Sequence, residues 1–261
     1  MPNIFKIEVV WYDLGELLKF LPVTLEIAVA AMLIGLTAGF ILALLRMKRL
    51  PVLTQIINFF ISFIRGTPII VQLYATYFGI PILLQYISYY RGVEYQMNRV
   101  QPILYAITAL ALNQAAYNAV TIQSAIEAVN KGEIEAATSL GMNGFQVMRR
   151  IILPEATELA IPSLGNNLIG LIKGTSLAFS CSVVEIAAQG KILAGRNYRY
   201  FESYVALAII YWAITIILEQ VFKYIVNAVR VPDSPKNVKG AAKKTESAVS
   251  KESLDTKEVV A

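Results

Sequence analysis

Long apolar blocks separated by short charged stretches make up most of the chain. A bilayer core about 30 Å thick requires roughly 20 residues of helix, and the blocks are of that size. We therefore predict transmembrane helices over residues 23–45, 66–89, 103–126, 161–188 and 204–226, with an apolar approach over 52–64 before the second. A segment in lipid must satisfy its backbone hydrogen bonds internally. The pattern thus predicts an all-α integral membrane protein.

Composition agrees with this interpretation. Hydrophobic residues make up 56% of the chain and charged residues 16%, whereas a soluble domain carries about 25% charged residues. The charges collect between the apolar blocks and in the last part of the chain. We expect an N-terminal segment over 1–22, a five-helix transmembrane domain over 23–228, and a disordered charged tail over 229–261.

The basic residues suggest an orientation. Arg46, Lys48 and Arg49 follow the first block directly, so we place that loop in the cytoplasm and the N-terminus outside. Lys131, Arg149, Arg150 and the lysine-rich tail agree, and the tail then lies inside. Five basic residues fall in loops that this scheme places outside: Arg91, Arg99, Lys191, Arg196 and Arg199. The N-terminal 20 residues carry several charges and no cleavage site, so we expect no removable signal peptide.

Two residue types narrow the chemistry. The chain has no histidine, which removes the commonest general base and the Ser-His-Asp arrangement. Cys181 is the single cysteine, so neither an internal disulfide nor a cysteine-based metal cluster can form. We expect no metal, no cofactor and no catalytic residue in this chain.

The stretch 131–158, between the third and fourth spans, is longer and more polar than the other connections. Glu133 and Glu135 favour the first turn of a short helix, and Gly141 suits its left-handed stop. Asn143 and Gln146 have the spacing of a capping box for a second helix. Pro154 is expected to end that second helix.

This loop offers a candidate docking surface. Ala137 and Gly141 are four residues apart, as are Ala136 and Leu140, so each pair is expected to share a helix face. Small residues permit close approach of another surface, and Leu140 and Phe145 supply apolar anchors. An ordinary connecting pair of helices would show the same pattern, so the residues alone leave both interpretations open.

The loop resembles the cytoplasmic coupling loop of permeases from ABC-type importers. The resemblance rests on Glu135-Ala136-Ala137, Gly141, and Ile151-x-Leu153-Pro154. Two further segments, Phe63 to Leu73 and Leu171 to Leu177, resemble the polar amino-acid branch, whose members carry histidine, glutamine, arginine or cystine. The resemblance covers approximately residues 20 to 228 and implies the five-span fold of a type I importer.

The resemblance also implies partners. Two permease subunits, identical or related, would form the pore, two cytoplasmic ATPases would hydrolyse ATP with Mg²⁺, and an extracytoplasmic binding protein would deliver substrate. The chain itself lacks the GxxxxGK[ST] phosphate-binding pattern, so it is expected to be a transport subunit in a bacterial inner membrane. The implied coupling residues are Gly132, Glu135, Ala136, Ala137, Leu140, Gly141, Ile151, Leu153 and Pro154.

Polar side chains inside the predicted spans are candidates for a substrate path, because such groups usually face the bundle interior. Interhelical hydrogen bonding is the alternative role for each of them. Arg65 and Lys173 carry charge, and either would suit a substrate carboxylate. The full set is Arg65, Gln72, Asn113, Gln114, Tyr117, Asn118, Gln123, Asn167, Lys173, Thr175 and Ser176.

The third span departs from the family at two positions. Relatives usually carry Glu and Arg where this chain has Val120 and Gln123. Without that acid a cationic side chain is harder to hold, which favours a neutral polar amino acid, with cystine as one candidate. An ion-coupled secondary transporter is the alternative function, although it would need an intramembrane acid and offers only Glu185, Glu26 and Glu219. A membrane scaffold without transport would leave the loop unexplained.

Overall fold

The computed structural model describes residues 5–92 and 100–229. Within these ranges the chain is built from helices and contains no strand. The order is α1 (Ile7–Leu18), α2 (Leu21–Met47), α3 (Pro51–Gly66), α4 (Ile69–Arg91), α5 (Pro102–Glu127), α6 (Lys131–Ser139), α7 (Gly144–Val147), the π-helical η2 (Met148–Ile152), α8 (Leu153–Gly174), the 3₁₀ segment η3 (Thr175–Cys181), α9 (Ile186–Asn197) and α10 (Tyr200–Val229).

Four helices, α2, α4, α5 and α10, are long and apolar enough to cross a membrane. The run from Gly144 to Cys181 passes the same test together with α9, to which it is joined by a 59° bend. This gives up to five spans over the described residues and confirms the predicted fold class. The tail beyond residue 229 lies outside the described residues.

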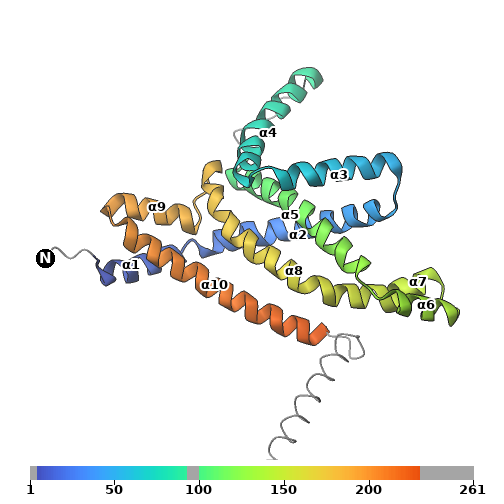
Figure 1. The fold of residues 1–261 in the computed structure, drawn as a ribbon. Helices are drawn as coiled ribbons and strands as arrows, with labels where there is room; N and C mark the ends of the chain where they lie inside the picture. The colour runs from blue at the N-terminus through green and yellow to red at the C-terminus, as the bar shows by residue number, and fades with distance from the viewer. Residues whose placement is uncertain (1–4, 93–99, 230–261) are drawn as a thin grey trace, which may run out of the picture.

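The helices form an elongated bundle with two distinct ends (Figure 1). Helices α6 and α7 lie at one end, here called the α6 end. Helices α1 and α9 lie at the opposite end, here called the α9 end. α4 leaves the bundle at a steep angle to α3 (Figure 1).

Small residues allow α2 and α5 to pack closely at the centre of the bundle. Ala31, Gly35, Gly39 and Ala43 recur every fourth residue along one face of α2 and are buried. A Cβ atom on Gly39 would lie 2.8 Å from the Asn118 Cβ and 3.0 Å from the Ala115 carbonyl oxygen. Close backbone approach of this kind is typical of membrane helix pairs. The main apolar core surrounds this contact.

The α9 end is held by buried polar contacts. Glu185 caps α9 by accepting the backbone N–H of Ala188 at 2.9 Å. The other carboxylate oxygen accepts hydrogen bonds from the hydroxyls of Thr24 on α2, at 3.2 Å, and Tyr211 on α10, at 3.4 Å. This acid, which the alternative function would need as an ion site, therefore has structural partners on two other helices.

Two of the predicted spans need corrected boundaries. The prediction of a helix from Gly66 misses the break at Thr67 and Pro68: the approach over 52–64 is the separate helix α3, and α4 starts at Ile69. Pro68 has no N–H and disfavours helix in the residue before it, so the break falls there. The fourth span was predicted over 161–188, but its helical run starts at Gly144 and breaks after Cys181, where Ser182 turns left-handed with φ 60° before α9.

Candidate docking loop and translocation cavity

The candidate docking loop at the α6 end consists of α6, α7 and the turn between them. The Asn130 side chain caps α6 by accepting the Gly132 N–H at 2.9 Å. Gly141 stops α6 with φ +83°, and two backbone bonds close the turn, Met142 N–H to the Ala137 carbonyl and Gly141 N–H to the Thr138 carbonyl. These bonds define a Schellman motif, so the predicted left-handed stop is confirmed.

The second predicted cap is also confirmed. Asn143 accepts the Gln146 N–H at 3.0 Å, and the Gln146 side chain accepts the Asn143 N–H at 2.9 Å. This reciprocal capping box starts α7. The loop is thus a pair of capped helices with a defined turn between them.

The predicted pairing of Ala137 with Gly141 on one helix face is wrong, whereas Ala136 and Leu140 are both exposed and are joined by the Leu140 N–H to Ala136 carbonyl bond. Ala137 is buried, with 3% of its surface exposed, and Gly141 lies beyond the last residue of α6. A left-handed glycine turns the chain away from the helix, so the two residues cannot line one face. The loop instead exposes Glu135, Ala136 and two large apolar side chains, Leu140 at 82% and Phe145 at 73%.

Pro154 does not end the second helix, contrary to the prediction. The helical run continues from Gly144 through η2 and α8 as far as Gly174. Pro154 follows directly on the wider π-helical turn of η2. A proline lacks the N–H of the regular ladder and crowds the preceding turn, and a π-helical turn accommodates such a defect.

The loop is fixed to the bundle by a small apolar core. Val129 is buried between α5 and α6. It clusters with Ala43 of α2, Ile126 of α5 and Ala156 of α8, and Ile134 of α6 packs against them. This apolar core therefore links α6 to residues of three membrane helices.

A polar cavity of about 410 Å³ lies between the α3–α4 break, α5 and α8. Four predicted substrate-path residues line it: Asn113, Gln114, Tyr117 and Asn167. Asn166, Thr67, Pro68, Gly170 and Gly174 contribute to the same wall. Amide and hydroxyl groups from distant parts of the chain therefore meet in one cavity.

Gln72 fastens the α3–α4 break to the cavity wall. Its Nε2 donates to the carbonyl oxygens of Ile64, at 2.7 Å, and Thr67, at 3.1 Å, and contacts the Thr67 hydroxyl at 2.9 Å. Its Oε1 accepts a hydrogen bond from Asn113 Nδ2 at 3.0 Å. Gln72 thus satisfies the carbonyls that the end of α3 leaves free.

Two further candidates, Asn118 and Arg65, support this wall, and Gln114 forms part of it. Asn118 is fully buried and accepts a hydrogen bond from Asn167 Nδ2 at 3.0 Å. The Arg65 guanidinium lies 5.2 Å from the centre of the Tyr117 ring, a cation–π arrangement beside the cavity. Gln114 is 6% exposed, and its Oε1 has no hydrogen-bond partner.

Four candidates lie elsewhere. Lys173 is exposed and does not line the cavity. The hydroxyls of Thr175 and Ser176 donate to the carbonyls of Ile172 and Lys173, both at 2.7 Å. Gln123 lies at the α6 end, where it accepts a hydrogen bond from Arg46.

The predicted set omits Thr67, Pro68, Asn166, Gly170 and Gly174, which also line the cavity. Pro68, Gly170 and Gly174 border the cavity, where the absence of bulk leaves space and a helix break supplies backbone groups. The Gly-Thr-Pro sequence at 66–68 and the two glycines four residues apart in α8 were the available signals.

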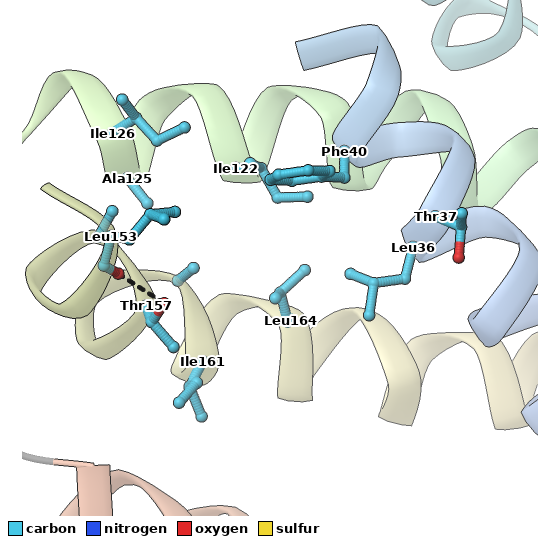
Figure 2. Close-up of a pocket in the computed structure, with 12 residues that line it drawn as sticks. Leu36, Thr37, Phe40, Ile122, Ala125, Ile126, Leu153, Thr157, Ile161 and Leu164 are labelled. Atoms are coloured by element: carbon cyan, nitrogen blue, oxygen red, sulfur yellow. Dashed lines mark hydrogen bonds between the residues drawn. The ribbon is translucent and has the colours of Figure 1, made fainter. Parts of the chain in front are cut away.

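A second hollow, between α2, α5 and α8 near the α6 end, is apolar (Figure 2). It measures about 380 Å³. Figure 2 shows Phe40, Ile122 and Leu164 lining it from three helices, while the Thr157 hydroxyl bonds to the Leu153 carbonyl. Of the described residues that line this hollow, only Thr37 and Thr157 have polar side chains, so it suits a polar solute less well than the polar cavity does. Among the described residues, no group of three or more His, Cys, Asp or Glu could hold a metal ion.

The helical architecture with a capped loop between two long helices is that of a multi-pass membrane transport subunit. Residues 35–231 match the family model for the binding-protein-dependent transport system inner membrane component. The chain therefore belongs to this family, and it is a permease subunit of an ABC transporter.

Curated relatives and a solved structure agree. The probable amino-acid permease protein YxeN of Bacillus subtilis (strain 168) is 45% identical over 201 residues, covering 77% of this chain and 85% of the relative. The L-cystine transport system permease protein TcyL of the same organism is 37% identical over 223 residues, covering 85% and 91%. A crystal structure of an amino acid ABC transporter with histidines superposes with a TM-score of 0.70 at 31% identity, covering 81% and 93%.

Proposed function

We propose that this permease passes a polar amino acid with an uncharged side chain through the cavity between α5 and α8. The observation that carries the proposal is a cavity of about 410 Å³, whose wall combines amides, hydroxyls and helix-break backbone with the apolar side chains of Ile69, Leu110 and Leu171. Such a wall can replace the hydration of an ammonium group, a carboxylate and a polar side chain inside a membrane.

The absence of charge among the lining residues supports a neutral side chain. Every residue that borders the cavity is uncharged, and Arg65 lies beside it on the Tyr117 ring. A cation at the rim attracts a carboxylate and repels a cationic side chain. Together with the likeness to an L-cystine permease, this makes cystine the first substrate to test.

The partners follow from the family and from the loop. We place a cytoplasmic ABC ATPase dimer, with its ATP and Mg²⁺, on the exposed Leu140 and Phe145 of the α6–α7 loop. A second permease subunit would complete the pore, and an extracytoplasmic binding protein would deliver substrate at the α9 end. On this proposal the protein lies in a bacterial inner membrane with its N-terminus outside and its C-terminus in the cytoplasm.

The decisive experiment is uptake into proteoliposomes that contain the permease, its ATPase and its binding protein. Labelled cystine, glutamine and arginine are offered with ATP, without ATP, and with ATP plus an ionophore. ATP-dependent uptake of cystine or glutamine that survives the ionophore supports the proposal. Uptake without ATP that the ionophore abolishes would establish the ion-coupled alternative, and preferred uptake of arginine would overturn the neutral-substrate assignment.

The docking surface is tested by a matched pair of variants. Leu140→Asp places a charge on the most exposed apolar side chain of the loop and should abolish ATPase binding, measured by co-purification. Ser139→Asp adds the same charge one residue earlier without removing an apolar group, so it should bind nearly normally. Equal binding by both variants would show that Leu140 does not dock the ATPase.

A further inference from the structure

Arg46 joins three helices at the α6 end. It lies in the last turn of α2 and donates from Nε to the Asn58 Oδ1 of α3 at 2.7 Å. A second nitrogen, Nη1, donates to the Gln123 Oε1 of α5 at 2.9 Å. Gln123 Nε2 in turn donates to Glu127 Oε1 at 2.7 Å. These four residues are called the Arg46 junction below.

The junction lies directly before the docking loop. Glu127 is the last residue of α5, and α6 begins at Lys131. Val129, between them, is buried in the apolar core that also contains Ala43 of α2. The chain between the junction and α6 is therefore short and packed, and a displacement of α6 must displace the end of α5.

The other arm of the junction leads to the cavity. Asn58 lies within α3, and α3 ends at Gly66 beside the cavity wall. There Gln72 holds the Ile64 carbonyl and accepts the hydrogen bond from Asn113, which lines the cavity. A rigid helix thus connects the junction at one end with the cavity at the other.

We propose that Arg46 is a positioning residue for transport coupling: it makes α3 follow α5 when α6 moves, so that the cavity wall changes shape in step with the ATPase. The proposal rests on the proposed function of the α6–α7 loop. It gives Gln123, which does not line the cavity, a role in coupling instead of substrate contact.

The chemistry of arginine suits this role. A guanidinium is planar and offers donors in fixed directions, so it can hold two acceptors on different helices at once. Both acceptors here are side-chain amide oxygens. A glutamine at this position would retain polarity but lose the reach, the fork and the charge of the guanidinium.

The test measures ATP hydrolysed per amino acid transported in the complete transporter in proteoliposomes. For Arg46→Gln we expect this ratio to rise at least about fivefold, as for a lost coupling interaction, while ATPase binding and the substrate KM stay near wild type. Lys48→Gln, an exposed cation in the following turn, is the matched control and should keep the wild-type ratio.

Two further variants separate positioning from general damage. Asn58→Leu leaves the Arg46–Gln123 bond in place and should raise the ratio in the same way, because it frees α3 alone. Gln123→Leu combined with Arg46→Gln should be no worse than the worse single variant, because both bonds belong to one connection.

An unchanged ratio in Arg46→Gln and Asn58→Leu would overturn the proposal, as would additive effects of Arg46→Gln and Gln123→Leu. If Arg46→Gln is recovered unfolded by size-exclusion chromatography, the ratio of Asn58→Leu alone decides. Failure of the proposed function is recognised separately, because the wild-type transporter would then show no ATP-dependent uptake at all.

Discussion

Gln114 carries a buried amide oxygen without a hydrogen-bond partner in the wall of the polar cavity. Leaving a buried acceptor unpaired costs about 1–3 kcal/mol, and a bound ammonium group would satisfy it. We expect Gln114→Leu to raise the KM for amino-acid uptake about tenfold or more, because a hydrogen bond to a charged group contributes about 1.5–3 kcal/mol. Initial uptake rates over a range of substrate concentrations measure this.

A control on the same helix keeps this prediction specific. Thr108 is exposed, and its hydroxyl bonds only to the Leu104 carbonyl among the contacts described for it. Thr108→Val removes a polar group of α5 outside the cavity and should leave the KM unchanged. If Gln114→Leu behaves like Thr108→Val, the substrate does not contact Gln114.

For single residues, reasoning from the sequence located the candidate site only in part. Asn113, Gln114, Tyr117 and Asn167 were chosen because polar residues in a membrane span are costly, and all four line the cavity. The same rule also selected Gln123, whose partner Arg46 is distant in sequence. A rule about single residues identifies which groups need a partner, whereas the identity of the partner depends on the tertiary fold.

Among the helical elements, α2 and α5 approach each other closely at Gly39. The missing Cβ would lie 2.8 Å from Asn118 Cβ and 3.0 Å from the Ala119 nitrogen, so neither helix can yield easily. We expect Gly39→Ala to destabilise the protein by about 1–3 kcal/mol, in the range for overpacking a core. The thermal midpoint in detergent is the measurement.

Gly79→Ala is the matched control for that prediction. Gly79 lies within α4, and a Cβ there would meet nothing within 4 Å. Alanine also favours helix over glycine by roughly 1 kcal/mol, so the midpoint of Gly79→Ala should stay constant or rise. Equal loss of stability in both variants would mean that α2 and α5 do not pack at Gly39 in the membrane protein.

The turn after α6 gives a second prediction for an element. Gly141 has φ +83°, a conformation that costs a side-chain-bearing residue about 1–2 kcal/mol. Gly141→Ala should therefore weaken ATPase binding by distorting the turn, while Gly141→Asn should retain most of it, because asparagine tolerates this conformation.

Gly144, which is helical and has nothing within 4 Å of a Cβ, supplies the control Gly144→Ala. Affinity for the purified ATPase distinguishes them, and equal affinity of Gly141→Ala and wild type would contradict the requirement for the turn.

Elements set by neighbouring residues were the ones that the sequence predicted best. The stop at Gly141 and the capping box of Asn143 and Gln146 depend on contacts within five residues, and both were predicted. Pro154 was misjudged because the π-helical η2 precedes it, and no local signal distinguishes that turn from a helix end. The break at Pro68 was missed because the apolar run continues on both sides of it.

For the whole molecule, the separation of α6 and α9 at opposite ends of the bundle makes the orientation measurable (Figure 1). Cys181, the single cysteine, is fully buried, so wild-type protein should not react with a membrane-impermeant maleimide. Lys48 at the end of α2 and Arg196 on α9 are both exposed. Replacing either with cysteine therefore reports on one end of the bundle without a competing thiol.

We expect the reagent to label Arg196→Cys in intact spheroplasts, and Lys48→Cys only after the membrane is opened, because basic residues cluster at the α2–α3 connection and cytoplasmic loops favour such clusters. The reverse pattern would invert the topology and place the docking loop outside, where no ATP is available to a partner ATPase. Labelling of both variants in intact spheroplasts would place the two ends of the bundle on the same side of the membrane. That result would contradict the odd number of spans predicted between residues 48 and 196. Import requires α6 to face the cytoplasm, where the nucleotide is, and the cavity to open towards the extracytoplasmic binding protein. The labelling pattern of these two variants therefore decides whether the geometry can support import.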